Sequence, residues 1–116
     1  MRLPSRDEWG ALAKAAGGTG DYGTDGTAGK ALKADHGWYN NGNGTDDFGF
    51  SALPGGHRYS VGDFYYAGNY GLWWTATEDG DYGAYYRNMK YDGDYVNEGY
   101  NYGNKGYGFS VRCVQE

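Results

Sequence analysis

The spacing of hydrophobic residues changes along the chain, and this change constrains the fold more than any other feature of the sequence. In the first third, Trp9, Leu12, Ala13 and Ala16 recur at helical spacing. From Phe48 onward, hydrophobic residues alternate with small or polar ones, as in half-buried strands. Helices followed by a meander of strands predict an α+β fold, with two short helices near the N-terminus and a small antiparallel sheet joined by long glycine-rich loops.

Both helices have recognisable boundaries. Ser5 and Glu8 fit a capping box at the start of the first helix, and the Gly17-Gly18 pair ends it. A second short helix is expected over residues 28–34, with its alanines and leucine on one side. Turn residues fill the stretches 19–27 and 40–47, which are expected to be loops.

Five segments are predicted to be extended, and the last is expected to be a buried strand. They cover residues 48–52, 57–66, 71–77, 84–91 and 108–114. In the second segment, Tyr59, Val61 and Phe64 are expected to face inward. In the last, Phe109, Val111 and Cys113 alternate with polar residues, so Cys113 is interpreted as a small buried side chain rather than a reactive thiol.

The core has to be built largely from aromatic rings. The 116 residues include 23 glycines and 14 tyrosines but no isoleucine. Few aliphatic residues and a net charge of −5 are typical of disorder, whereas an aromatic content of 19% is not. Aromatic side chains bury large apolar areas, so we expect one folded domain over residues 1–116. Trp73 is predicted to lie in the core and Trp74 at its edge. The alternative is that Trp73 forms the floor of the binding face, if its strand presents that side outward.

Charge and hydropathy exclude several classes of partner. The pI near 4.8 argues against nucleic acid and anionic membranes, since both require clustered Lys and Arg. No apolar run reaches bilayer length, so no direct membrane insertion is expected. No signal peptide is visible, and Met1 directly precedes a structured motif, so we expect the domain to be part of a longer protein.

Residues 79–107 are predicted to form a binding surface. About three quarters of them are Asn, Asp, Tyr or Gly. Tyrosine offers a large contact area with few torsions to freeze, and the small polar residues offer adaptable hydrogen bonds, as in antibody loops. The alternative is that the tyrosines pack on one another and the glycines serve tight turns. The candidate ligand-binding residues are Asp79, Asp81, Tyr82, Tyr86, Asn88, Lys90, Asp92, Asp94, Tyr95, Asn97, Glu98, Tyr100, Tyr102 and Asn104.

No catalytic, cofactor or metal site is predicted. Glu78, Asp79 and Asp81 form one acidic group, and Asp92 with Asp94 forms another. Neither group matches an EF-hand calcium loop, so adventitious binding of Ca²⁺ is the one form of metal binding left open. His36 and His57 lie in no catalytic motif. Arg87 and Arg112 are expected to bond loop carbonyls or a carboxylate such as Glu8 rather than a ligand.

Six motifs in order resemble one family over nearly the whole chain. They are RLPSRDEWGAL, AGKALK, FGFSALPGG, GLWWTAT, AYYRNM and GFSVRCV. The chain resembles the Fibrobacter succinogenes major paralogous domain, a family of surface-associated bacterial domains. The resemblance implies a C-type lectin-like fold. Family members usually carry a Cys-Pro-x-Gly-Trp motif before the RLPS stretch, whose cysteine is a natural partner for the one at Cys113. Here the sequence starts after that motif, at Met1-Arg2, so the disulfide that the resemblance implies stays open, with a shortened chain or a variant without the disulfide as the alternatives.

The same fold also carries the variable proteins of diversity-generating retroelements, in which adenine-directed mutagenesis rewrites AAY-type codons near the C-terminus. Asn, Asp, Tyr, Gly, Ser and His can all be reached from such a codon. The composition of residues 79–107 is consistent with that mechanism, and also with the residue preference of an ordinary family member, which is the interpretation we favour. Under either origin, we expect a non-catalytic binding module for a protein or glycan on another cell or particle surface. Its expected location is extracellular, on a cell or virion surface, as in an adhesin or receptor-binding protein. A carbohydrate-binding module and a self-associating structural domain are the alternatives.

Overall fold

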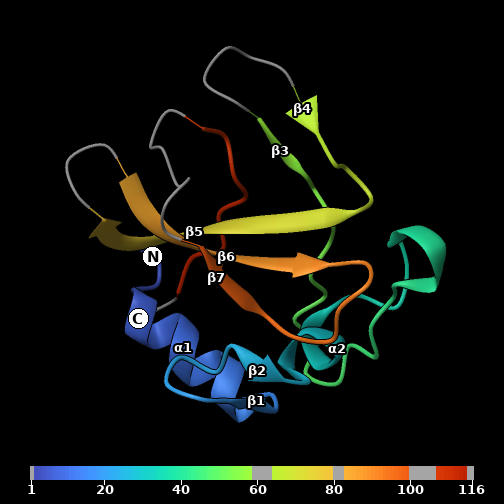
Figure 1. The fold of residues 1–116 in the computed structure, drawn as a ribbon, viewed down its shortest axis with the longest axis horizontal. Helices are drawn as coiled ribbons and strands as arrows, with labels where there is room; N and C mark the ends of the chain where they lie inside the picture. The colour runs from blue at the N-terminus through green and yellow to red at the C-terminus, as the bar shows by residue number, and fades with distance from the viewer. Residues whose placement is uncertain (1, 59–63, 80–82, 100–106, 115–116) are drawn as a thin grey trace.

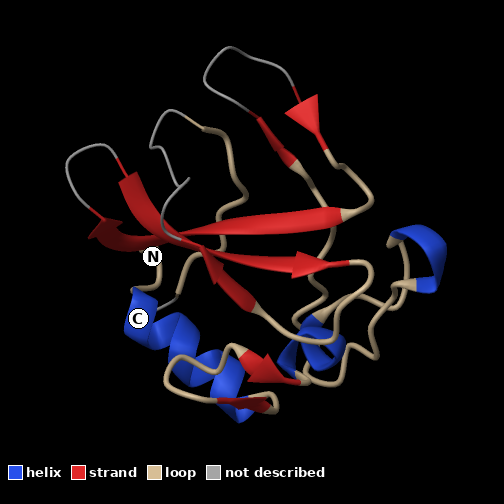
Figure 2. Ribbon diagram, viewed as in Figure 1, coloured by secondary structure: helices blue, strands red, loops and turns tan. Residues whose placement is uncertain are grey.

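The α+β architecture is built around one antiparallel sheet (Figure 1, Figure 2). The computed structural model describes residues 2–58, 64–79, 83–99 and 107–114. The two α-helices lie below the sheet in Figure 1, whereas a short two-stranded hairpin projects above it. The elements are α1 (Arg6–Ala15), β1 (Gly18–Thr19), β2 (Asp25–Gly26), α2 (Ala28–Leu32), the 3-10 helix η1 (Tyr39–Asn41), β3 (His57–Arg58), β4 (Phe64–Tyr65), β5 (Tyr70–Asp79), β6 (Gly83–Lys90) and β7 (Asn97–Gly99).

Helix α1 begins at the predicted capping box. The Ser5 hydroxyl accepts a hydrogen bond from the Glu8 backbone N–H at 3.2 Å, and the Ser5 N–H donates to Glu8 Oε1 at 2.9 Å. These bonds satisfy two of the N–H groups left without partners at a helix start. The Arg6 N–H donates to Thr77 Oγ1 at 2.9 Å, which ties the same end of the helix to β5. The capping interpretation is therefore confirmed.

The central sheet has the strand order β5-β6-β7, with both pairs antiparallel. Trp74 pairs with Tyr86, and Arg87 pairs with Glu98. Because paired residues share a face, this register defines two faces. The inner face carries Trp73 and Arg87 toward α1, and the outer face carries Trp74 and Tyr86. The predicted strands at 71–77 and 84–91 are confirmed, and β7 is an additional strand that the turn-rich sequence did not predict.

Aromatic rings and alanines form the core beneath the inner face. Trp9 is only 1% exposed and packs against Trp73 with ring centroids 6.2 Å apart. Phe50 meets Trp9 edge-on at 5.8 Å, a favoured geometry for aromatic pairs. Trp73 is buried and Trp74 half-buried, as predicted. The core therefore rests on rings, as the composition requires.

The predicted strand over residues 48–52 is wrong. Phe48 is exposed, and Ser51 has a positive φ of 55°. The cause is local: Asp46 accepts hydrogen bonds from both the N–H and the hydroxyl of Ser51, at 2.8 and 2.6 Å. Such side-chain bonds compete with a strand ladder. Only Ala52 pairs, in an isolated parallel bridge with Lys33.

The predicted buried strand over residues 108–114 is also wrong. The segment makes three isolated bridges to different neighbours, in which Gly108 pairs with Arg58, Ser110 with Trp73 and Val114 with Arg2. Because its partner changes every few residues, the alternating side chains meet no continuous inner surface. Val111 is 57% exposed and Cys113 is an exposed free thiol, so the prediction of a buried Cys113 is wrong.

The predicted extended segment 57–66 is confirmed only at its ends. His57 pairs with Tyr65 and Arg58 with Phe64, so β3 and β4 form an antiparallel pair. Tyr59 and Val61 lie outside the described residues.

The loop predicted at 19–27 is largely confirmed, although its two ends pair as β1 and β2. The pairing of Arg2 with Val114 brings the two ends of the described chain together (Figure 1).

Candidate binding face of the sheet

The outer face of the sheet brings together four of the predicted ligand-binding residues. Tyr86, Asn88 and Lys90 alternate along β6 on this face. Each lies opposite a β5 residue, in the pairs Trp74–Tyr86, Leu72–Asn88 and Tyr70–Lys90. On the other side of β6, Asn97 is paired with Asn88 and therefore shares the face. We call this surface the outer face throughout.

A groove runs over the outer face beside the β3–β4 hairpin. One hollow of about 260 Å³ is lined by His57, Tyr66, Tyr70, Leu72, Asn88 and Lys90. A second hollow of about 370 Å³ shares His57 and continues past Arg58 and Phe109. We call the two hollows together the sheet groove. Its walls come from three separate parts of the chain.

Ring contacts hold the walls of the sheet groove in place. His57 stacks on Tyr66 with centroids 5.6 Å apart, and Tyr66 meets Tyr70 edge-on at 4.9 Å. Phe109 stacks on Trp74 at 4.3 Å and lies 4.9 Å from the Tyr86 ring. Rings that brace one another lose little further freedom when a ligand binds, so this surface is organised in advance.

The polar groups of the groove differ in charge. The Lys90 ammonium lies 5.9 Å from the centroid of the Tyr70 ring. Burial lowers the pKa of His57, so this ring is neutral at pH 7. The Asn88 Oδ1 is buried and has no hydrogen-bond partner among the residues that the structure describes. An unsatisfied buried acceptor costs about 1–3 kcal/mol, which marks Asn88 as an amide not committed to the fold.

The position of the Tyr86 ring depends on a glycine. Tyr86 is paired with Gly99 of β7, and its ring lies directly over that residue. A Cβ atom at position 99 would overlap the Tyr86 ring carbons. The absence of a side chain at Gly99 therefore lets Tyr86 lie flat on the outer face.

Three other predicted residues lie on the loop between β6 and β7, which packs against α2 rather than the groove. The Lys30 N–H donates to the Asp94 carbonyl at 3.0 Å. The buried Lys33 ammonium donates to the carbonyls of Lys90 and Gly93, both at 3.0 Å. A Cβ on Gly29 would lie 2.5 Å from the Tyr95 carbonyl oxygen. Asp92, Asp94 and Tyr95 are thus held by backbone contacts away from the groove, with both carboxylates exposed.

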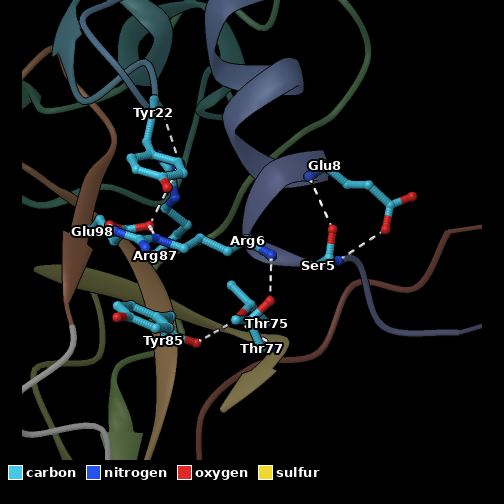
Figure 3. Close-up of polar contacts among 9 residues, drawn as sticks. All are labelled: Ser5, Arg6, Glu8, Tyr22, Thr75, Thr77, Tyr85, Arg87 and Glu98. Atoms are coloured by element: carbon cyan, nitrogen blue, oxygen red, sulfur yellow. Dashed lines mark hydrogen bonds and ion pairs between the residues drawn. The ribbon is translucent and has the colours of Figure 1, made fainter. Parts of the chain in front are cut away.

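Glu98 lies on the inner face, in a buried charge network (Figure 3). Arg6 donates to both Glu98 oxygens, at 2.8 and 2.7 Å, and its guanidinium lies 3.8 Å from the Tyr22 ring centroid and 4.1 Å from that of Tyr85. Arg87 is 0% exposed, donates to the Tyr22 carbonyl at 2.7 Å and lies 3.9 Å from Glu98. Glu98 raises the pKa of Arg6 above its usual range. Glu98 therefore binds two arginines of its own chain.

Both arginines singled out from the sequence bond loop carbonyls, as predicted. Arg87 reaches Tyr22, and Arg112 donates to the Phe50 carbonyl at 2.8 Å while lying 4.1 Å from the Phe50 ring centroid. Glu8 pairs with Arg2 instead, at 2.5 Å. That contact and the capping bond lower the pKa of Glu8 to about 2.

The remaining predicted residues are not brought to the groove by any described contact. Asp79 ends β5 opposite Gly83, at the far end of the hairpin from Lys90. Asp81, Tyr82, Tyr100, Tyr102 and Asn104 lie outside the described residues. In the described ranges, no three His, Cys, Asp or Glu side chains are grouped so that they could hold a metal ion. Within the same ranges, no helix is long and apolar enough to cross a membrane.

Sequence reasoning missed most of the groove's aromatic wall. Tyr70 continues the alternation of Leu72 and Trp74, so extending that strand by one residue would have found it. His57 is the first residue of β3, and Tyr66 directly follows β4. Nothing in the sequence indicates that these two rings stack on each other.

Comparisons with known proteins agree with the motif pattern. Neither the curated proteins nor the solved structures include a significant match to this chain. The model of the Fibrobacter succinogenes major domain matches residues 1–115. The chain therefore belongs to the Fibrobacter succinogenes major domain family.

Proposed function

We propose that this domain is a non-catalytic ligand-binding module and that the outer face of its sheet is the binding surface. The observation that carries the proposal is the row of Tyr86, Asn88 and Lys90 beside the sheet groove. Ring faces, an amide and an ammonium group converge there on one solvent-open hollow. Concave surfaces with aromatic walls and a few polar groups are typical ligand sites.

The partner in this proposal is a protein or glycan on another cell or particle surface. The abundance of tyrosine and small polar residues in 79–107 supports recognition rather than catalysis, because these residues supply contact area and hydrogen bonds. An extracellular location, as in an adhesin or receptor-binding protein, follows from that partner. A C-type lectin-like fold is part of the same proposal and is supported by the resemblance of the six motifs.

Diversification by a retroelement is a further part of the proposal. The split between the two faces limits where it could act. Arg87, Met89 and Val96 are fully buried, so variation there would unfold the domain. Tyr86, Asn88 and Asn97 on the outer face are only half-buried, so we expect variation there to be tolerated better. A reverse transcriptase gene next to this one, with a near-copy of its 3′ end differing at adenines, would support the idea, and an ordinary neighbourhood would refute it.

Binding can be tested with a glycan array and a panel of fixed bacterial cells as probes. Wild-type protein is compared with Tyr70→Ala and Asn88→Ala, which alter the groove, and with Asp35→Ala, at an exposed residue that does not line it. We expect the two groove variants to lose the signal and Asp35→Ala to keep it. Equal signals from all four proteins would contradict the proposal. Growth of the particle mass with concentration in light scattering would favour the self-association alternative instead.

A further inference from the structure

We infer that the ligand of the sheet groove is an acidic glycan, a saccharide chain that carries carboxylate or sulfate groups. This inference rests on the proposed function, because it names the ligand class of the same groove. Three observations support it: the charge of the groove, the chemistry of its walls and the pairing of the neighbouring strand edge.

The groove is positively charged in a negatively charged protein. The chain has a net charge of −5, yet the described residues that line the groove include Lys90 and Arg58 and no carboxylate. Lys90 lies in one hollow and Arg58 in the other, with the neutral His57 between them. The nearest acidic stretch of β5 is at the opposite end of the strand, where Asp79 faces Gly83. Such a field favours an anionic ligand with charges spaced along its length.

The walls of the groove match sugar rings. Tyr66 is 50% exposed, and Tyr70 extends the aromatic surface beside it. The C–H face of a pyranose ring is apolar and lies flat against such rings, whereas its hydroxyls need polar partners at the edge. Asn88 supplies an amide between Tyr70 and the Tyr86 ring, and its unsatisfied Oδ1 leaves that amide available for rearrangement. A saccharide therefore uses both the rings and the amide.

An acidic peptide is less well matched, because the strand edge beside the groove is occupied. Peptides commonly bind by adding a strand to an exposed sheet edge. The outer edge of β5 is already bridged by Gly56 at Gly71 and by Ser110 at Trp73. Ser110 also exchanges backbone hydrogen bonds with Leu72 and Trp74, at 2.8 and 3.1 Å. A peptide at the groove would thus lack main-chain partners on β5.

The experiment compares matched ligands that differ only in charge. Oligogalacturonates and their methyl esters form one pair, dextran sulfate oligosaccharides and unsulfated dextran oligosaccharides a second, and poly-glutamate is the peptide probe. Binding is measured by titration calorimetry at two salt concentrations with wild-type protein, Lys90→Gln, Arg58→Gln and Tyr70→Ala. Lys14→Gln, an exposed lysine on α1, is the matched control.

We expect at least one acidic oligosaccharide to bind and its neutral partner to bind at least about tenfold more weakly, since a charged hydrogen bond contributes about 1.5–3 kcal/mol. Lys90→Gln should weaken binding by a similar factor, higher salt should weaken it further, and Lys14→Gln should not change it. Tyr70→Ala should weaken every oligosaccharide.

Three results would overturn the inference. One is equal binding of charged and neutral partners with loss only in Tyr70→Ala, which would leave the groove as a binding site for neutral sugar. Another is binding of poly-glutamate as tight as that of the oligosaccharides. The third is no binding by any oligosaccharide.

The proposed function fails separately, if Tyr70→Ala and Asn88→Ala change no interaction on the array or with cells. Thermal melting of each variant shows that it is folded.

Discussion

The two faces of β6 use the same kinds of residues for opposite purposes. On the inner face, Arg87 is committed to the Tyr22 carbonyl and to Glu98, which also binds Arg6. On the outer face, Asn88 has a buried oxygen without a described partner, and Lys90 faces a groove. One face uses its polar groups to close the structure, and the other leaves them at the groove where we propose that a ligand binds. Polar composition alone therefore does not separate structural residues from candidate binding residues; the face on which a residue lies does.

Glu98→Ala should have the largest effect, because it breaks the inner network. The substitution leaves the fully buried Arg87 without its carboxylate and frees the Arg6 guanidinium. Removing one partner of a buried ion pair costs about 3–5 kcal/mol. Urea denaturation should show a loss of this size, and Asp47→Asn, at an exposed carboxylate, should show almost none. A loss below about 1 kcal/mol would mean that the network does not hold the inner face together.

The neighbouring residues Met89 and Lys90 provide a direct comparison of the two faces. Met89 is fully buried on the inner face, so Met89→Ala should cost about 2–5 kcal/mol through lost packing and the cavity left behind. Lys90→Ala should change the free energy of unfolding by no more than about 0.5 kcal/mol, since its side chain faces the groove. Similar losses from both substitutions would contradict the assignment of the faces.

The smallest effect concerns acid stability on the outer face. Burial lowers the pKa of His57 from its ordinary value of 6.5. The unfolded chain therefore binds this proton more readily than the folded one, and the His57 contribution to stability is lost as pH falls below about 6.5. His57→Gln should flatten the dependence of the unfolding free energy on pH between 7 and 5. An unchanged slope in urea titrations would show that His57 is not shielded from solvent in this groove.

Local signals in the sequence were enough to predict the helices and the main hairpin. The capping box at Ser5 and the alternation in 71–77 and 84–91 depend only on nearby residues, so they could be recognised without a structure. Segments paired by distant partners could not. The C-terminal segment alternates like a strand, but it divides its bridges among Arg58, Trp73 and Arg2, which no local pattern reveals.

The candidate site was predicted in part, for a related reason. Composition predicted a binding surface in residues 79–107 but could not separate Asn97 from Glu98, which lie on opposite faces of β7. That separation depends on the register between β6 and β7. His57 and Tyr66 were missed because they come from another part of the chain and reach the groove only through tertiary packing.

The contact between Tyr86 and Gly99 links the evolutionary histories of two positions. Because the Tyr86 ring occupies the space above Gly99, any side chain introduced at 99 first would collide with it. A smaller residue at 86 removes the collision, after which position 99 becomes free to change. We therefore expect accepted substitutions to follow an order, with 86 changing before 99. A large ring at 86 and a side chain at 99 should not occur together. The number of residue combinations accepted on this surface is therefore smaller than the number obtained by varying each position independently.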